Sequence, residues 1–393
     1  MQDSQKRTQN FIVTQPYTVE SILILLRKGF HGIHQDYSTK ILKVPNDERI
    51  YIPITIRDPN SVEQAIQDMK NSIGSDITIK ELPWDNTWAK IPRSASLHDN
   101  LLDRIPSPVL EFIPQTFDII GSLAIIEIDR WGDLSKVVQD PVLMEQYLSL
   151  IGNTIIRYHK NITTVLNKVG SVEGEFRLRN YEIIAGEPTT TTIHKENNVK
   201  LCVDPTKMFF SPRLSYERDR VASIKFPKDS MIIDCFAGCG PYSIQITHKH
   251  RVNVYSIEKN HIAYQYLLKN ISLNQNKLKG KIHPYLGDFR DFRESNLGKE
   301  CINRTNCMIM NLPEHSCAFI PHISPFIKDT GIYLVFYAFF PSSDSLNQVI
   351  VKIQALLNEY DLRIVRIKEK RVVFSFSPDQ NNVCVDMIIK KAH

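Results

Sequence analysis

The stretch Met231-Ile-Ile-Asp-Cys-Phe-Ala-Gly-Cys-Gly240 decides the fold of this chain. Three apolar residues lead to Asp234 and then to a turn with Gly238 and Gly240, a pattern that predicts a strand, a tight turn and a helix. Glycine has no Cβ, so the backbone of this turn can lie close to a ligand. The dinucleotide fingerprint has a third glycine, but Ser243 stands at that position. The pattern therefore favours a nucleoside without a pyrophosphate, such as S-adenosylmethionine (SAM).

A second string, Asn311-Leu-Pro-Glu314, follows the apolar run 307–310, which predicts a buried strand. Ligands of open α/β sheets bind at the carboxyl ends of the parallel strands, where this amide would lie. Pro313 has no N–H and stiffens the turn, which leaves nearby carbonyl groups free to face a planar base. An ordinary turn would explain this string alone, but two such strings at strand ends favour a binding site.

Two acids occur between these strings, each at the end of an apolar run. Glu258 ends the run 251–258 and lies twenty residues after Gly238, where an acid commonly accepts hydrogen bonds from ribose hydroxyls. Asp288 ends the run 282–288 and is placed to bond an adenine amino group. Either acid alone would more often be a solvated loop residue. The series of glycine turn, acid, acid and asparagine is what indicates a nucleoside site.

The bulk composition is that of an ordinary globular protein of two or three domains. The chain has 393 residues, 42% of them hydrophobic and 23% charged, and a formal net charge of +5. Charge is more concentrated in the stretch 194–228, which holds eight Lys and Arg against four Asp and Glu. Such a stretch suggests contact with a phosphate backbone, and a solvated charged face is the alternative.

The cysteines and the N-terminus bear on the compartment. The seven cysteines include no C-x-x-C pair, which indicates reduced thiols in an intracellular protein and no metal site. The first sixteen residues are polar and lack the apolar core of a secretory signal, and Asp3 argues against a mitochondrial transit peptide without excluding one. The longest apolar run, 331–340, is too short to span a bilayer. We expect a cytoplasmic protein without membrane contact, with the nucleus and the mitochondrial matrix left open as further locations.

Three domains are expected along the chain: 1–100, 101–200 and 201–393. In the first, the patterns predict a helix over 19–28, a strand over 50–56, a helix over 61–73 and a linker over 84–100. In the second, they predict a glycine turn with a buried strand within 117–128, a helix with apolar positions from Met144 to Ile155, and strands over 165–169 and 177–184.

The third domain alternates strand and helix patterns, which implies a parallel sheet. It closes with β-rich runs over 362–368 and 383–390 around the turn Ser377-Pro-Asp-Gln380. An antiparallel hairpin that closes a parallel sheet is typical of SAM-dependent methyltransferases rather than dehydrogenases. The expected fold class is α/β, with a Rossmann-like SAM-dependent methyltransferase domain preceded by a small α+β domain and an N-terminal domain.

Three strings together resemble the archaeal and eukaryotic tRNA (guanine-37 N1)-methyltransferases: Asn311–Glu314, Asp234–Pro241 and Phe210–Arg218. The resemblance covers residues 105–393 and thins out over the first hundred; it extends through the strings Phe117–Gly121, Gly174–Arg179 and Ile193–Asn197. It implies a monomer with a Rossmann-like SAM domain, an RNA-recognition domain before it and an N-terminal domain that helps to read tRNA shape. The implied partner is tRNA, contacted at the anticodon loop and through its overall L shape.

The resemblance also assigns roles to residues. It implies that Glu217 is the general base, that Arg177 orients and stabilises the guanine, and that Asn311 and Pro313 line the pocket for the target base. The residues expected to contact SAM are Arg218, Asp234, Phe236, Gly238, Gly240, Glu258, Lys259, Asp288, Phe289 and Asn311. Many eukaryotic relatives have His where Arg218 stands and archaeal ones have Arg, so the contact to the methionine carboxylate differs within the family.

The chemistry of guanine supports the same assignment. N1 carries a proton in the neutral base, so attack on the SAM methyl requires a base such as a carboxylate near an arginine. Methyl transfer is an in-line displacement that needs positioning more than covalent help. The alternative for Glu217 is an exposed helical acid paired with Arg218 or Arg220.

Other functions remain open at this point. One is transfer of an aminocarboxypropyl group from SAM. That sister family usually has Asn-Pro-Pro in the region of Asn311, and Leu312 and Glu314 argue against it here. Another is a protein that binds SAM and RNA without catalysis. A dehydrogenase is the weakest alternative, because Ser243 replaces the third glycine and nicotinamide would have no obvious hydride partner.

Overall fold

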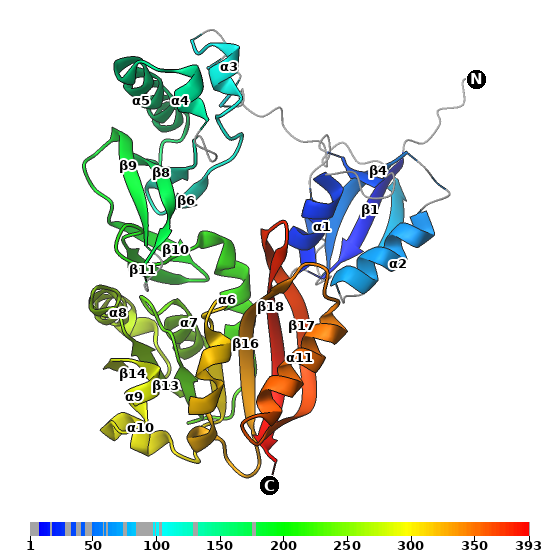
Figure 1. The fold of residues 1–393 in the computed structure, drawn as a ribbon, viewed down its shortest axis with the longest axis vertical. Helices are drawn as coiled ribbons and strands as arrows, with labels where there is room; N and C mark the ends of the chain where they lie inside the picture. Colours follow the sequence, from blue (N-terminus) through cyan, green and yellow to red (C-terminus); the bar gives the residue numbers. More distant parts are fainter. Residues whose placement is uncertain are drawn as a thin grey trace. The chain divides into compact units, whose positions relative to one another are not determined.

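The computed structural model describes residues 8–392 except for the following gaps: 16–17, 28–32, 37–40, 44–48, 58, 60–61, 74–76, 84–96, 99, 102–103, 129–132 and 175–177. The chain divides into two compact units. Unit 1 combines Met1–Pro92 with Gly298–His393, and unit 2 is Arg93–Leu297. Figure 1 shows the elements of both units in the colours of the sequence.

The N-terminal part of unit 1 is an antiparallel sheet with two helices (Figure 1). The strand order is β2-β4-β1-β5, and β3 pairs with β4. The elements are β1 (Thr8–Thr14), α1 (Val19–Arg27), β2 (Ile33–Gln35), β3 (Leu42–Lys43), β4 (Ile50–Ile56), α2 (Val62–Ile73) and β5 (Thr78–Pro83). Successive side chains of a strand point to opposite faces of the sheet, so this sheet contributes to two hydrophobic clusters. Ile12 and Ile52 pack with Met69 of α2 in one cluster, and Phe11 packs with Tyr51 in the other. The two helices and the strand expected here are confirmed.

The first sixteen residues contain a strand that the sequence patterns did not predict. Thr8–Thr14 forms β1, which pairs with β4 on one side and β5 on the other. Phe11 and Ile12 are completely buried, and the Gln9 side-chain amide donates to the Ile54 carbonyl oxygen (3.0 Å). The apolar run of β1 is short and has polar residues on both sides, so its sequence pattern did not predict a strand. Packing against the rest of the sheet stabilises it.

The C-terminal part of unit 1 carries the strand order β15-β16-β18-β17. Its elements are β15 (Cys307–Met310), β16 (Ile332–Pro341), α11 (Leu346–Asn358), β17 (Leu362–Ser377) and β18 (Gln380–Lys391). β15 and β16 are parallel, whereas β18 is antiparallel to both β16 and β17. The closing hairpin is therefore confirmed, and both of its strands are longer than expected. The Ser21 hydroxyl of α1 donates to the Val372 carbonyl oxygen of β17 (3.3 Å), which joins the two parts of unit 1.

Unit 2 begins with a four-stranded sheet of order β6-β7-β8-β9, in which only β7 and β8 are parallel. The elements are α3 (Ser107–Leu110), β6 (Asp118–Ile120), β7 (Leu123–Ile126), α4 (Leu134–Val137), α5 (Pro141–Tyr158), β8 (Thr164–Glu173) and β9 (Leu178–Gly186). Gly121 joins β6 to β7 at φ +57°, and its N–H donates to His194 Nδ1 (3.2 Å). The helix, the glycine turn and the strands expected in this region are confirmed.

A hairpin that the sequence patterns did not reveal follows, formed by β10 (Thr192–Glu196) and β11 (Val199–Val203). Asn197 and Asn198 connect the strands with φ of 45° and 67°. Asparagine tolerates the left-handed region, so Asn-Asn between two β-rich runs was an available signal for a tight hairpin turn. The domain boundary expected between residues 200 and 201 lies within β11.

The rest of unit 2 alternates strands and helices, and its three strands are parallel in the order β14-β13-β12. The elements are α6 (Ser215–Ala222), β12 (Met231–Asp234), α7 (Pro241–Lys249), β13 (Asn253–Glu258), α8 (His261–Asn274), β14 (Lys281–Leu286) and α9 (Phe289–Phe292). Helix α10 (Asn296–Cys301) begins in unit 2, and its residues from Gly298 on belong to unit 1. The alternation that predicted a parallel sheet is confirmed. Across the described residues, every helix is too short or too polar to cross a membrane.

Candidate active site

The glycine turn is built as the sequence predicts, at the carboxyl end of β12. Gly238 and Gly240 have φ of +57° and +86°, a region that side-chain-bearing residues rarely adopt. A Cβ on Gly240 would lie 2.4 Å from the Leu267 side chain of α8, whereas a Cβ on Gly238 would meet nothing within 4 Å. Gly240 therefore allows helix packing, and Gly238 borders open space that a ligand can occupy.

Asp234 is a buried acid below this turn. Its Oδ2 accepts a hydrogen bond from the Ser243 hydroxyl (2.6 Å), which in turn accepts one from the Ser256 hydroxyl (2.7 Å). Ser243 thus uses the place of the third glycine to support the acid. Asp234 Oδ1 has no hydrogen-bond partner among the described residues. Burial raises the pKa of Asp234 to about 6, against the effect of the Ser243 hydrogen bond.

Glu258 connects the end of β13 to the glycine turn. Its Oε2 accepts from the Gly238 N–H and its Oε1 accepts from the Asn260 N–H, both at 2.6 Å. Burial raises the pKa of Glu258, while these backbone donors act in the opposite direction. Each carboxylate oxygen can accept a second hydrogen bond, so Glu258 can hold the turn and still bind a hydroxyl.

Asp288, which follows β14, forms ion pairs with two basic side chains. It accepts from the Arg290 backbone N–H (2.9 Å) at the start of α9, pairs with the Arg290 guanidinium (2.5 Å) and lies 3.2 Å from Lys259 Nζ. The Arg290 side-chain hydrogen bond is the main cause that lowers the pKa of Asp288. Two rings expected at the cofactor, Phe236 and Phe289, lie edge to face with centroids 6.2 Å apart. The structure therefore brings Lys259 next to Asp288, and Phe236 next to Phe289.

These features of unit 2 fit a nucleoside ligand such as SAM. Gly238 borders open space, Glu258 has remaining acceptor capacity, and Asp234 Oδ1 is a buried acceptor without a described partner. Acceptors at the carboxyl ends of consecutive parallel strands suit the hydroxyl and amino donors of an adenosine. In the part of the chain that the structure describes, no group of three or more His, Cys, Asp or Glu side chains could hold a metal.

Glu217 lies in the first turn of α6 and is buried, with 4% of its surface exposed. Arg220 Nη2 donates to its Oε1 (2.8 Å), and Arg220 Nε lies 3.1 Å from both carboxylate oxygens. The pairing with Arg220 was one part of the alternative interpretation, but the exposure it assumed is absent. The Glu217 carboxylate is therefore buried, and the Arg220 guanidinium fixes its orientation.

Arg218, the next residue on α6, is buried and makes its contacts within the protein. Its Nε and Nη2 donate to the two oxygens of Glu196, both at 2.6 Å, and its guanidinium lies 4.9 Å from the Phe210 ring centre. Burial acts to raise the pKa of Glu196, but hydrogen bonds from His194 and Arg218 outweigh it and hold the pKa at about 2. Arg218 would have to release part of this bidentate pair in order to bind a methionine carboxylate.

The Asn311–Glu314 turn belongs to unit 1, at the carboxyl end of β15. The Ser316 hydroxyl donates to the Leu312 carbonyl oxygen (2.9 Å), and Phe339 N–H donates to the Pro313 carbonyl oxygen (3.1 Å). The turn is thereby fixed on both sides. The Asn311 side chain is half-buried and makes no hydrogen bond to another described residue.

The remaining expected residue, Arg177, lies outside the described residues. Several residues that support the site were not identified from the sequence: Glu196, Ser256 and Asn260. Asn260 caps α8 through its side chain and also bonds Glu258 through its backbone. Its place immediately before a helical pattern was a usable signal, whereas Arg218 and Gln245 donate to Glu196 from 22 and 49 residues away and gave none.

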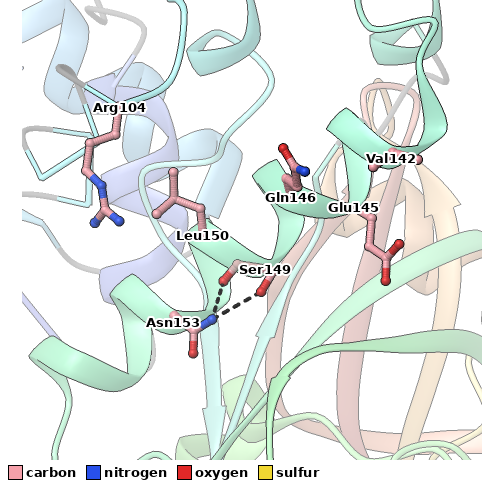
Figure 2. Close-up of a pocket in the computed structure, with 7 residues that line it drawn as sticks. All are labelled: Arg104, Val142, Glu145, Gln146, Ser149, Leu150 and Asn153. Atoms are coloured by element: carbon pink, nitrogen blue, oxygen red, sulfur yellow. Dashed lines mark hydrogen bonds between the residues drawn. The ribbon is translucent and has the colours of Figure 1, made fainter.

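A hollow beside α5 holds none of the expected site residues (Figure 2). Its lining consists of Arg104, Val142, Glu145, Gln146, Ser149, Leu150 and Asn153. Asn153 there donates to the Ser149 carbonyl oxygen (2.8 Å) within the same helix. The hollow is open and most of its residues are successive turns of one helix, so we do not assign the reaction to it.

A glycine turn, acids at successive strand ends and a closing antiparallel hairpin define a SAM-dependent methyltransferase fold. Comparison with known proteins gives the family. Residues 192–365 match the TRM5/TYW2 methyltransferase domain, and residues 97–189 match the TYW2 N-terminal domain. The chain belongs to the TRM5/TYW2 methyltransferase family, which is SAM-dependent, and the expected fold class and cofactor are confirmed.

Individual relatives differ in the activity that their names state. The tRNA (guanine(37)-N(1))-methyltransferase Trm5b of Pyrococcus abyssi is 35% identical over 72% of this chain and 77% of its own length. The Trm5b of Methanocaldococcus jannaschii is 31% identical over 87% of this chain and 89% of its own. The tRNA(Phe) (4-demethylwyosine(37)-C(7)) aminocarboxypropyltransferase of Pyrococcus horikoshii is 25% identical over 75% and 97%.

Two solved structures align with this protein over nearly the whole chain. The crystal structure of Trm5b from Pyrococcus abyssi aligns with a TM-score of 0.59 and 28% identity, over 97% of this chain and 99% of that chain. The complex of aTrm5 and tRNALeu aligns with a TM-score of 0.59 and 27% identity, over 96% and 99%.

Proposed function

We propose that this protein transfers the methyl group of SAM to N1 of guanosine 37 of tRNA, next to the anticodon. The observation that carries the proposal is the buried carboxylate of Glu217, held by Arg220 at the start of α6. The names of the relatives at 35% and 31% identity support the same reaction. The complex of a similar protein with tRNALeu supports tRNA as the substrate.

A side chain of this protein can remove the N1 proton of guanine. Glu217 would accept the N1 proton of guanine, because its carboxylate is shielded from water and held in a fixed orientation by Arg220. When bound, SAM supplies an electrophilic methyl group for a single in-line displacement. Asn311 would hold the base by its free amide, and Pro313 would keep the turn rigid. Arg177 would balance the negative charge that develops at O6.

Binding of SAM is assigned to unit 2. Glu258 would accept from the ribose hydroxyls, Asp288 would accept from the adenine amino group, and the backbone at Gly238 would lie against the ligand. Asp234, Gly240, Lys259 and the rings of Phe236 and Phe289 would support these contacts. We keep Arg218 as a contact for the methionine carboxylate only if it can release Glu196.

A second reaction has specific support. Residues 97–189 match the TYW2 N-terminal domain, and one relative over 75% of the chain is an aminocarboxypropyltransferase. In both reactions a carbon atom attached to the SAM sulfur is transferred, so the cofactor site alone does not separate them. Leu312 and Glu314 favour methyl transfer, since Leu312 stands where the first proline of the Asn-Pro-Pro expected of the sister family would be.

The deciding experiment uses SAM labelled either in the methyl group or in the aminocarboxypropyl group. Purified protein is incubated with a tRNA transcript that carries guanosine at position 37 and with a matched transcript that carries adenosine there. We expect methyl label in 1-methylguanosine from the first transcript only. Label from the aminocarboxypropyl group would establish the second reaction. If SAM and tRNA bind without label transfer, the assay is repeated with tRNA carrying 4-demethylwyosine at position 37, and no transfer there either would establish a non-catalytic protein.

Further parts of the proposal concern organisation. We propose that residues 1–100 read tRNA shape, that 101–200 form the RNA-recognition domain, and that 201–393 form the catalytic domain. The protein would act as a cytoplasmic monomer that contacts the anticodon loop and the L shape of tRNA. Removal of residues 1–100 should then weaken tRNA discrimination more than SAM binding, which calorimetry and tRNA competition can measure separately.

A further inference from the structure

The tip of the β17–β18 hairpin is fastened to the carboxyl end of β16 in unit 1. Ser342 N–H donates to the Asp379 carbonyl oxygen (2.8 Å), and the Ser342 hydroxyl donates to the Pro378 carbonyl oxygen (2.9 Å). Three residues earlier, Phe339 N–H donates to the Pro313 carbonyl oxygen (3.1 Å). The hairpin tip, the end of β16 and the Asn311–Glu314 turn are thus joined by hydrogen bonds into one group.

Two aromatic rings stack within this group. The ring centroids of Phe339 and Phe376 lie 4.4 Å apart with an interplanar angle of 29°. Phe376 remains 44% exposed, although it is packed on Phe339. Because Phe339 is held by its backbone beside Pro313, the exposed ring of Phe376 has a fixed support.

Strand direction places these rings at the ligand-binding edge. β15 and β16 are parallel, and β17 also runs parallel to β16 because both are antiparallel to β18. The carboxyl ends of all three strands therefore lie at the same edge, which is where open α/β sheets bind ligands. Single exposed apolar residues are common on protein surfaces, so the argument depends on this location and on the stacked support.

The charge around Phe376 favours a base over a phosphate. The segment 374–380, Phe-Ser-Phe-Ser-Pro-Asp-Gln, carries one charged residue, and that residue is the acidic Asp379. Phosphate contacts require donors such as Lys and Arg, whereas nucleobases stack on aromatic rings irrespective of charge. Unpaired bases of RNA loops are commonly recognised in this way.

We propose that Phe376, supported by Phe339, is a stacking surface for an unpaired nucleobase of the RNA substrate, adjacent to the base that enters the pocket beside Pro313. The inference rests on the proposed function, since it takes RNA as the substrate. It adds a second base-binding position, which would hold the loop open while the target base lies at the turn. Such a contact acts on RNA binding and not on SAM binding.

The experiment compares Phe376→Ala, Phe376→Leu and Phe376→Trp in the full-length protein. The RNA is a tRNA transcript with 2-aminopurine at the nucleotide on either side of position 37, because stacking on an aromatic ring quenches 2-aminopurine fluorescence. Tyr360→Ala is the matched control, since Tyr360 is 37% exposed but precedes β17 at its amino end. SAM affinity is measured by calorimetry, and the RNA kinetics are measured with saturating SAM.

We expect Phe376→Ala and Phe376→Leu to weaken RNA affinity and raise the KM for RNA by roughly 5- to 150-fold, the usual effect of one base stacked on an aromatic ring. The quenching should be lost in both and retained in Phe376→Trp. SAM affinity should be unchanged in every variant, and Tyr360→Ala should behave as the wild type.

Two results would overturn the inference. One is wild-type RNA affinity and quenching in Phe376→Ala. The other is full rescue by Phe376→Leu, which would indicate an apolar contact without stacking. Either result leaves the proposed function intact as long as the wild-type protein methylates the transcript. A wild-type protein that neither binds nor methylates tRNA would instead refute the proposed function and this inference with it.

Discussion

Unit 2 and unit 1 differ in how the polar side chains expected to bind ligands are held. In unit 2, the carboxylates of Glu217, Glu258 and Asp288 are all hydrogen-bonded to neighbouring arginine or backbone donors. In unit 1, Asn311 makes no side-chain hydrogen bond to a described residue, and an exposed aromatic ring lies near its turn. A preorganised set of acids suits a small ligand with fixed donors, whereas an open amide and a flat ring suit a base that arrives from solution.

The largest effect should come from Glu217→Gln. Glutamine keeps the shape but cannot accept the N1 proton as a base, so the single-turnover methyl-transfer rate should fall by roughly 10²- to 10⁴-fold. SAM affinity should change little, because the side chain acts on the target base. Glu359→Gln, a change at an exposed acid, serves as the control. An unchanged rate would remove Glu217 from the mechanism.

The next largest effect is on the free energy of unfolding, through the ion pair between Glu196 and Arg218. The pKa of Glu196 is about 2 in the fold and 4.5 ordinarily. The pair therefore stabilises the fold above pH ~4.5, and that stabilisation is lost as the pH falls through about 2. The shift corresponds to about 3 kcal/mol. We expect Glu196→Gln to lower the free energy of unfolding by about that amount at pH 7, with a smaller difference at pH 3.

Urea unfolding at both pH values measures this difference, with Glu111→Gln as an exposed control. A loss that is independent of pH would mean that packing, and not charge, sets the contribution of Glu196. The same variant also bears on Arg218. If SAM affinity rises when Glu196 is neutralised, Arg218 has been released toward the cofactor.

A smaller effect is expected at Glu258. Replacement by alanine leaves the Gly238 N–H and a ribose hydroxyl without an acceptor, a loss of about 1–3 kcal/mol in SAM binding. Calorimetry should show SAM affinity weakened by roughly 5- to 150-fold, while tRNA affinity is retained. Normal SAM affinity in Glu258→Ala would contradict the assignment of the cofactor to unit 2.

We expect the smallest effect for Asn311→Ala, on the free energy of unfolding. Since the side chain makes no described hydrogen bond, the free energy of unfolding should change by less than about 0.5 kcal/mol, although methyl transfer should slow. Asn270→Ala is the contrast, because the Asn270 amide accepts from Cys202 N–H (2.6 Å) and donates to the carbonyl oxygens of Cys202 and Cys239. That variant should lose about 1–3 kcal/mol. Equal losses in thermal unfolding would mean that Asn311 has a structural role.

The sequence predicted those parts of the fold whose signals are local. The run of apolar residues before Asp234, the two glycines and the acid at Glu258 each depend on neighbours a few residues away, and all three are placed as expected. Strand β1 and the β10–β11 hairpin were not predicted. β1 has polar residues beside its apolar core, and its stability comes from pairing with strands whose partner residues are at least 36 positions later in the chain (Thr14 with Ile50).

The sequence by itself determined the fold class, the glycine turn and which acids end the strands, because backbone conformation and hydrophobic periodicity are encoded locally. Only the tertiary structure decided what each of those side chains is bonded to. Glu217 and Arg218 are consecutive on one helix, yet one pairs with Arg220 and the other with Glu196 of β10. Phe339 and Phe376 are 37 positions apart and stack only because the hairpin tip is fastened to β16. Partners of this kind depend on contacts between distant segments, and these form only when the chain is packed.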